Sequence, residues 1–325
     1  MSYDVSSRVE FDEKPPRANN PAWPRVAIII LNWNGKTDTL ECLASLKKLD
    51  YPNVDILVVD NGSQDGAVEA IRVAYPMVQV IALKENLGFV GGNNVGIVEA
   101  QRQGVDFVLL LNNDTVVAPD FLRTLMTAVI QNDRLRIAGP LIYYHQQPRV
   151  IWSAGGEIDW RRGTTRMMSM GETDTGQFGN VPIPVDFLTG CALLVGREVL
   201  ERVGLLDERF FAYYEETEWC VRAQKAGYTC WLVPEAKIWH KISPEAREAS
   251  PLVHYYMTRN RLLFLRLSRA GAKAWLFTAA GFARTLMSWT VRPKWRGKQA
   301  QRAAMLQAIR DYRDDRFGKV ELVKS

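Results

Sequence analysis

Four polar segments of this 325-residue chain each follow a short apolar run. Their sequences are NWNGK (32–36), DNGSQDG (60–66), KENLGFVGGNNVG (84–96) and NNDT (112–115). Asparagine, aspartate and glycine are common turn residues, so any one of these segments could be a plain turn. Four of them at equivalent positions, two with a carboxylate at the end of the apolar run, are typical of a ligand site.

A second polar group lies in EETEWCVRAQKAG (215–227), whose pattern predicts a helix. Helical spacing places Glu215, Glu218 and Arg222 on successive turns, with Glu216 on another side. The preceding FFAYY segment supplies apolar walls, which raise the pKa of a carboxyl group towards the range useful to a general base. We interpret the glutamates as a base and its partner; the alternative is a solvated charged face.

Asp114 and His240 are candidates for holding a divalent cation. A carboxylate with an imidazole suits Mg²⁺ or Mn²⁺ and leaves coordination positions open for phosphate oxygens. A lone histidine is more often structural, so the pairing of these two distant residues is a hypothesis. The glycines within 88–96 lack the G-x-G-x-x-G spacing, and no P-loop motif occurs, which disfavours hydride transfer and P-loop chemistry.

The apolar runs before the polar segments predict buried strands at 26–31, 54–60, 78–83 and 106–111. Helical patterns alternate with these runs, which indicates a Rossmann-like, mostly parallel sheet with helices on both faces. Ligands of such sheets bind beyond the carboxyl ends of the strands. All four polar segments would meet at that edge.

Local patterns predict four further elements. Asp38 and Glu41 form a capping box that indicates the start of a helix. Residues 119–130 predict another helix, residues 155–179 an irregular loop, and residues 229–240 a strand.

The overall composition is that of a globular protein, with 47% apolar and 24% charged residues. The four cysteines have no C-x-x-C spacing, which argues against a zinc site and against a disulfide framework. Residues 1–24 are polar and contain no apolar stretch of the kind found in signal peptides, so we expect a disordered cytosolic leader.

The charge of the chain is unevenly distributed. Residues 241–325 contain 18 Lys and Arg against 6 Asp and Glu, a net charge of +12, which predicts an anionic partner. Nucleic acid is disfavoured, because no nucleic-acid-binding motif is present. An anionic membrane surface is the partner that we expect.

The most apolar predicted helix of this region spans residues 274–291. One face of it carries four large apolar side chains: Trp275, Phe282, Leu286 and Trp289. Because Arg284 interrupts the apolar stretch, we expect the helix to lie in the membrane interface rather than to cross the bilayer. The alternative is a buried helix with a solvated basic face.

The chain resembles glycosyltransferase family 2, specifically its rhamnosyltransferase-like branch, in five motifs. In chain order these are AIIILNWNG, VVDNGSQDG, NLGFVGGNNVG, LLLNNDT and DFLTGCALLVGREVLERVGLLDERFFAYYEETEWCVRAQKAGY. The resemblance covers residues 25–265. It implies the GT-A fold and a metal-dependent, inverting transfer from a nucleotide-diphosphate sugar, here dTDP-rhamnose.

The resemblance also implies roles for residues of the donor site. Asp60 would accept the imide N–H of a thymine or uracil ring. Asn112 and Asp114 occupy the place of the family's D-x-D motif, where Asp114 would bind Mn²⁺ or Mg²⁺ and His240 would close the metal shell. The other residues expected to line the nucleotide and sugar are Asn32, Asn34, Asn61, Asn86, Gly88, Asn93 and Asn113.

On the acceptor side, Thr189 and Gly190 match a segment that flanks the acceptor site in this family, and Arg222 is expected to belong to that site too. Glu216 falls on the second position of the family's Glu-Asp motif, the general base. Glu215 and Glu218 stay open as alternative bases. A single base without a covalent nucleophile implies inversion at the anomeric carbon.

The chain departs from the family pattern at two positions. Asn112 stands where an aspartate is usual, which removes one negative charge near the metal and the ribose. Glu216 stands where an aspartate is expected, which adds one methylene, so the base must sit slightly further back.

We therefore expect a catalytic domain over residues 25–242, with a nucleotide-sugar-binding part (25–118) and an acceptor-binding part (119–242). A basic amphipathic helical tail would follow over 243–325. The expected enzyme adds a single sugar, rhamnose, to a lipid-linked glycan acceptor in cell-wall or surface-polysaccharide synthesis. Its expected place is the cytoplasmic face of the plasma membrane, as a peripheral (monotopic) protein.

Two other readings of the sequence stay open. A sugar nucleotidyltransferase would share a similar fold and metal dependence but normally has a basic glycine-rich loop after the first strand, which NWNGK matches poorly. A catalytically inactive, membrane-bound scaffold would not need Asp114, Glu216 and His240. The sequence leaves open whether the protein forms a homo-oligomer.

Overall fold

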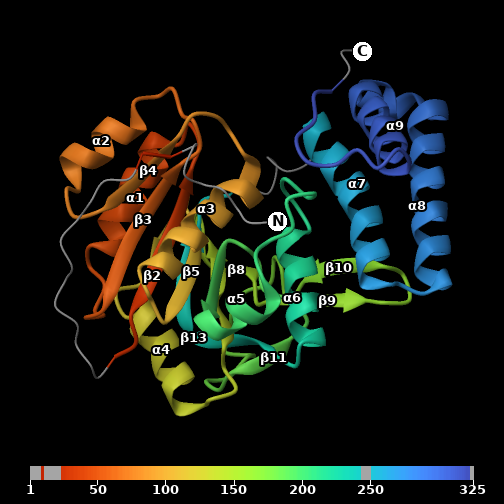
Figure 1. Cartoon of the computed structure of the whole chain (residues 1–325). Helices are drawn as coiled ribbons and strands as arrows, with labels where there is room; N and C mark the ends of the chain where they lie inside the picture. Colours follow the sequence, from red (N-terminus) through yellow and green to blue (C-terminus); the bar gives the residue numbers. More distant parts are fainter. Residues whose placement is uncertain (1–8, 11–22, 243–249, 323–325) are drawn as a thin grey trace.

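The computed structural model describes residues 9–10, 23–242 and 250–322. A central β-sheet runs through the α/β part of the molecule (Figure 1). Its strands are β1 (Val9–Glu10), β2 (Val26–Asn32), β3 (Val54–Asp60), β4 (Gln79–Leu83), β5 (Phe107–Asn112), β6 (Thr115–Val117), β7 (Ile137–Tyr144), β8 (Gln147–Ser153), β11 (Ile183–Val185), β12 (Ala192–Gly196) and β13 (Cys230–His240). The order across the sheet is β1-β4-β3-β2-β5-β12-β7-β13-β11, with β6 beside β13 and β8 beside β7.

The N-terminal half of the sheet is parallel, as predicted. β4, β3, β2 and β5 run side by side in one direction, and the register places Asn32 opposite Asp60. The other half is mixed, because β12 inserts antiparallel between β5 and β7 while β7 and β13 are parallel. The predicted α/β class is confirmed, with parallel pairing concentrated in the first half of the sheet.

Helices cover both faces of the sheet. α1 (Lys36–Leu46), α2 (Ala67–Ala74) and α4 (Phe121–Gln131) pack on one face, and α3 (Gly88–Arg102), α5 (Arg197–Val203) and α6 (Glu215–Lys225) pack on the other. Successive residues of β2 point to opposite faces, so Ile28 joins the core under α1 while Ile29 joins the core under α3. Both faces are therefore buried, which explains the continuous apolar runs in the sequence.

Two local predictions are wrong. The segment expected to be an irregular loop contains a hairpin of β9 (Gly156–Asp159) and β10 (Thr164–Met167). The capping box at the start of α1 does not form, because the helix begins after Gly35 and no side chain caps it. Asp38 and Glu41 instead form ion pairs with Lys241, and these pairs join α1 to the chain just after β13.

The C-terminal region is helical, with α7 (Pro251–Ser268), α8 (Ala272–Val291), the 3₁₀ segment η1 (Pro293–Lys298) and α9 (Gln299–Arg313). α7 packs against α6 and α9, and its residues Leu263, Phe264 and Leu265 are buried in the same core as β7 and α6. α7 thus belongs to the body of the α/β part. α8 lies on the outer side of the helical group, away from the sheet (Figure 1).

The face of α8 expected to meet lipid points inward. Trp275 packs near Tyr312, and Trp289 makes an edge contact with His254. The Arg261 guanidinium lies over the ring of Phe282, and Leu286 is half-buried. Large aromatic side chains gain most from burial, so this face packs on α7 and α9 and leaves the opposite face exposed. The predicted lipid-facing residues are therefore wrong.

Two further expectations concern parts that are only partly described. Of the expected leader, residues 1–8 and 11–22 lie outside the described residues, and Val9–Glu10 pair with β4. The start of the expected tail, residues 243–249, also lies outside them. Within the described ranges, no helix is both long and apolar enough to cross a membrane.

Candidate active site at the carboxyl edge of the sheet

The loops after β2 and β3 are joined around Asp60. The side-chain amide of Asn32 donates to Asp60 Oδ2 (2.6 Å) and to Ser63 Oγ (3.2 Å), and the backbone N–H of Ser63 donates to Asp60 Oδ1 (2.9 Å). Asn34, whose φ is +50°, donates its backbone N–H to Ser63 Oγ at 2.8 Å. The carboxylate of Asp60 is thereby held in a fixed direction at the strand end.

The loop after β4 joins this group through Asn61. The amide of Asn61 donates to Asn86 Oδ1 and to the carbonyl of Gly88, both at 3.0 Å, and its Oδ1 accepts from the N–H of Leu87 at 2.8 Å. Gly88 has a φ of +78°, and a Cβ there would lie 2.6 Å from the carbonyl oxygen of Phe211. A glycine is therefore required where α3 begins.

The loop after β5 completes the edge. Asn113 donates from its side-chain amide to Thr39 Oγ1 (3.0 Å) and to Asn32 Oδ1 (3.3 Å). The backbone N–H of Asn112 donates to the carbonyl of Cys191 at 2.9 Å. The structure thus brings the loops after all four parallel strands together.

Asn93 differs from the other asparagines expected at the donor site. Its amide donates to the carbonyl of Phe89 within α3, at 2.9 Å, and its side chain is buried. This bond is local to the helix, so Asn93 supports the start of α3.

Asp114 and His240 lie against each other. His240 ends β13 and pairs with Thr115 of β6, which places its Nε2 3.0 Å from Asp114 Oδ1. The ring of Trp152 packs edge-on against the imidazole, with ring centroids 4.5 Å apart. Burial opposes the ionisation of Asp114, but the close approach of the His240 imidazole and the charge of Lys241 outweigh it and lower the pKa of Asp114. Two residues paired only by hypothesis from the sequence are neighbours in space.

The donor set of this pair fits a divalent cation that binds a diphosphate. Asp114 Oδ1 is buried and accepts no hydrogen bond of good geometry, and it faces the imidazole nitrogen. No cluster of three or more His, Cys, Asp or Glu side chains able to hold a metal occurs among the described residues. One carboxylate and one imidazole leave most positions of Mg²⁺ or Mn²⁺ for phosphate oxygens and water.

The segment that leads into α6 has an unusual backbone. Phe211, Tyr213 and Tyr214 have φ values of +64°, +71° and +71°, a region that L-residues rarely adopt. Two buried side chains of α7 hold this segment. The amide of Asn260 donates to the carbonyls of residues 210, 212 and 213 at 2.8, 2.7 and 2.8 Å, and Arg259 donates to the carbonyls of residues 209 and 210.

Sequence reasoning missed these two residues. Arg259 and Asn260 lie in the middle of an arginine-rich helix, where an Arg-Asn pair is expected to face solvent. Their burial and their backbone contacts depend on how α7 docks, which no local pattern encodes.

The strained segment places Glu215 and Glu216 at the start of α6. Glu215 is buried, and burial together with the charge of Glu216 raises its pKa well above the ordinary value. A Cβ at Gly190 would lie 2.8 Å from the Phe89 ring and 3.9 Å from Glu216 Cβ, so Glu216 lies beside Gly190. The carbonyl of the next residue, Cys191, accepts a hydrogen bond from the backbone N–H of Asn112 at the end of β5. Glu216 and the end of β5 therefore flank the same short segment, residues 189–191.

Glu218 and Arg222 are engaged elsewhere. The Arg222 guanidinium pairs with Glu218 at 2.9 Å and donates to the carbonyls of Val203 and Leu205, both at 2.8 Å. Both side chains line a surface groove with Asp207. The structure does not bring them to Gly190, and their contacts fasten α6 to the segment after α5.

Comparison with known proteins agrees with this arrangement. A family model described as "Glycosyltransferase like family 2" matches residues 24–260. The dTDP-rhamnosyl transferase RfbF of Shigella flexneri is 24% identical over 246 residues, which cover 73% of this chain and 79% of that protein. An N-acetylglucosaminyl-diphospho-decaprenol L-rhamnosyltransferase of Mycobacterium tuberculosis is 29% identical over 218 residues, which cover 61% of this chain and 70% of that protein.

Solved structures show the same fold. The mannosyltransferase PcManGT of Pyrobaculum calidifontis, in complex with GDP-Man and Mn²⁺, aligns with a TM-score of 0.54 and 17% identity over 93% of this chain and 91% of that chain. Residues 1–349 of S. aureus TarS, in complex with UDP-GlcNAc, align with a TM-score of 0.55 and 15% identity over 89% and 80%. The predicted GT-A fold is confirmed. The chain belongs to glycosyltransferase family 2 and is a glycosyltransferase.

Proposed function

We propose that this enzyme transfers one rhamnosyl residue from dTDP-rhamnose to a lipid-linked glycan, with inversion and with the help of a divalent cation. Two relatives support this choice, since the name of one includes dTDP-rhamnosyl transfer and that of the other includes a decaprenol-linked acceptor. The place of reaction would be the cytoplasmic face of the plasma membrane, during synthesis of the cell wall or a surface polysaccharide.

The observation that carries the proposal is the Asp114–His240 pair beside the linked asparagine loops. Asp60, whose carboxylate is held by Asn32 and Ser63, would accept the imide N–H of thymine. Asp114 and His240 would hold Mn²⁺ or Mg²⁺, which supplies positive charge to the leaving diphosphate. The polar edge then orients the donor with its anomeric carbon towards the acceptor side.

Glu216 is the residue that we assign as general base. It would take the proton of the acceptor hydroxyl as the new C–O bond forms and the bond from the anomeric carbon to the diphosphate breaks. Because burial raises the pKa of its neighbour Glu215, the negative charge of the pair is favoured on Glu216. Glu216 lies beside Gly190, in the segment expected to flank the acceptor, which supports this assignment.

A donor screen tests the donor and metal assignments. Thermal stability of the full chain is measured with dTDP-rhamnose, UDP-sugars and GDP-sugars, each with Mn²⁺, with Mg²⁺ and with a chelator. We expect stabilisation by dTDP-rhamnose with a cation, its loss in Asp114→Asn, and its retention in Asp133→Asn, which changes a highly exposed carboxylate. Stabilisation by a different nucleotide sugar, or a response of Asp114→Asn equal to that of the unchanged chain, contradicts the assignment.

Turnover measurements test the base. Glu216→Gln should keep the donor-dependent thermal shift and lower kcat by about 10²-fold or more, as loss of a general base does. Glu218→Gln removes a carboxylate of the same helix that is paired with Arg222, so it serves as the control and should keep most of the activity. If Glu215→Gln is inactive and Glu216→Gln is active, the base is Glu215.

A further inference from the structure

The outward side of α8 carries an apolar stripe. Leu276, Met287 and Val291 are exposed by 70%, 65% and 70%. The spacing of the whole set keeps it on one side of a helix. We call the following residues the outer stripe of α8: Leu276, Phe277, Ala280, Ala283, Met287 and Val291. Large apolar side chains this exposed and this well aligned mark an interaction surface.

Basic side chains surround the outer stripe. Residues 250–310 contain twelve Lys and Arg and neither Asp nor Glu. Five of them are exposed on α8 and η1 and form no ion pair with any described residue: Lys273, Arg284, Arg292, Lys294 and Arg296. The partner of this surface must therefore bring negative charge as well as apolar material.

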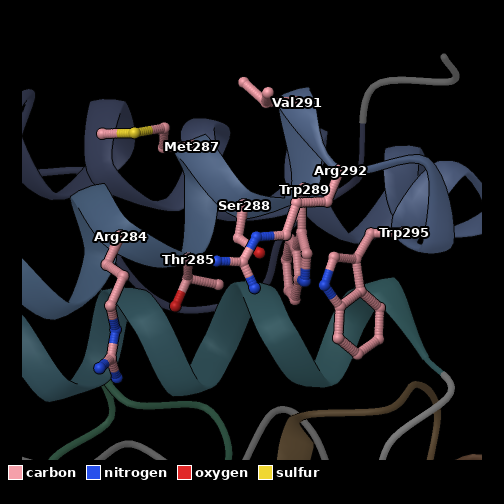
Figure 2. Close-up of a pocket in the computed structure, with 8 residues that line it drawn as sticks. All are labelled: Arg284, Thr285, Met287, Ser288, Trp289, Val291, Arg292 and Trp295. Carbon is pink, nitrogen blue, oxygen red and sulfur yellow. The ribbon is translucent and has the colours of Figure 1, made fainter.

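A groove opens where α8 ends and η1 begins. It has a volume of about 550 Å³ and is lined by arginine, tryptophan and small polar side chains, with Met287 and Val291 at its margin. In the view of Figure 2, the rings of Trp289 and Trp295 lie next to each other below α8, and Met287 and Val291 lie above it. Guanidinium groups beside tryptophan rings suit a phosphate that is attached to an apolar body.

We propose that the outer stripe of α8 and the basic side chains of η1 bind the surface of an anionic phospholipid bilayer. α8 lies in the plane of the interface, with its apolar stripe among the acyl chains and a head-group phosphate between Arg284 and Arg292. This arrangement needs no spanning helix, and its mixture of apolar and basic side chains is that of an interfacial helix. The surface does not depend on which sugar or nucleotide the enzyme uses, so it goes beyond the proposed function.

A bilayer explains the surface better than a protein partner or a second copy. A second copy would bring the same positive charge to the contact, and the exposed arginines would repel. An anionic bilayer supplies many phosphates and an apolar layer at once. It would also hold the enzyme where a lipid-linked acceptor is found.

Co-sedimentation of the full chain with vesicles tests the proposal. The vesicles contain phosphatidylcholine with phosphatidylglycerol at zero or about two fifths of the lipid. We expect binding that rises with phosphatidylglycerol and falls only in part at high salt, because the apolar share is insensitive to salt. The double variant Leu276→Glu, Met287→Glu should bind about ten-fold or more weakly, because both carboxylates face the acyl layer.

A matched control separates the stripe from exposed apolar residues in general. Val73 and Met77 lie at and after the end of α2, exposed by 75% and 63%, and Val73→Glu, Met77→Glu should bind vesicles like the unchanged chain. Both double variants should keep the melting temperature and the donor-dependent thermal shift, since these four side chains are on the surface. Arg284→Ala, Arg292→Ala should weaken binding and reduce its dependence on salt.

Three results would overturn the proposal. The first is no binding to vesicles rich in phosphatidylglycerol, and the second is equal binding by the stripe variant and its control. The third is a dimer in solution that the stripe variant converts to monomer without any effect on vesicles, which would make a second copy the occupant. The donor screen is independent of vesicles, so failure of the membrane surface leaves the assigned reaction standing.

Discussion

Asn260 offers the sharpest test of how α6, which carries the proposed base Glu216, is positioned. The substitution Asn260→Ala removes the amide that donates to the carbonyls of Phe210, Ala212 and Tyr213. The carbonyl of Phe210 keeps a donor in Arg259, whereas the half-buried carbonyls of Ala212 and Tyr213 lose the hydrogen bond from this amide. One buried group left unsatisfied costs about 1–3 kcal/mol, and partial contact with water reduces that cost for these two carbonyls, so the free energy of unfolding should fall by about 1–3 kcal/mol in total.

The same substitution should affect catalysis through the backbone. Left-handed conformations at Phe211, Tyr213 and Tyr214 cost on the order of 1–3 kcal/mol each and persist only while the surroundings hold them. Without the amide the segment can relax, and Glu216, which lies two residues after Tyr214, moves away from Gly190. We expect kcat to fall by at least about ten-fold, while the donor-dependent thermal shift stays, because the loops around Asp60 are not touched.

A stability-matched control makes the measurement decisive. Leu125→Ala creates a cavity under α4, on the opposite face of the sheet, and should cost about 2–5 kcal/mol. Urea unfolding and steady-state kinetics are measured for both variants at a temperature where both are folded. If Asn260→Ala and Leu125→Ala lose kcat in the same proportion to their loss of stability, the positioning role is wrong.

Three other outcomes follow from the described contacts. Gly88→Ala should destabilise the protein more than Gly176→Ala in thermal unfolding, because both glycines have positive φ but only Gly88 meets a carbonyl, that of Phe211; equal costs would contradict this. Because burial raises the pKa of Glu215 above 4.5, the stability that its protonated form contributes is full below about pH 4.5 and is lost as the pH rises through the folded-state pKa. Glu215→Gln should therefore gain stability relative to the unchanged chain as the pH rises above about 4.5, and a difference that stays constant with pH in urea unfolding would refute it. Burial raises the pKa of the Cys42 thiol to about 12, and all four cysteines are buried, so a thiol reagent at about pH 8 should label the unfolded chain and not the folded one.

Much of the donor edge could be predicted from the sequence, because it depends on local patterns. A buried parallel strand must be a short apolar run, and its loop must begin at the strand end. The positions of Asn32, Asp60 and Asn112 therefore follow from the alternation of apolar runs and polar segments in the sequence. The pairing of Asp114 with His240 needed the register of β6 against β13, which only a resemblance to known proteins could suggest. The expected roles of these residues stay predictions.

The parts that could not be predicted depend on docking between distant elements. α8 has apolar residues on two sides, and periodicity alone cannot tell which side packs on α7 and α9. The side with Trp275, Phe282 and Trp289 is the one expected to be exposed, whereas the gain from burying large aromatic rings turns it to the interior. Asp38 and Glu41 have the spacing of a helix cap, yet both carboxylates form ion pairs with Lys241, the residue that follows β13.

The docking of α7 has a consequence for exchanging parts between related enzymes. Its buried residues share a core with β7 and α6, and Arg259 also donates to the carbonyl of Gly318 after α9. In a hybrid joined near residue 242, α6 would come from one parent and Arg259 and Asn260, which hold the segment before α6, from the other. Such a hybrid should lose activity even if both parents are active. A hybrid that stays active should therefore take α7, α9 and the sheet from one parent and differ only at exposed residues of α8 and η1, so the outer surface can vary between relatives more freely than the helices behind it.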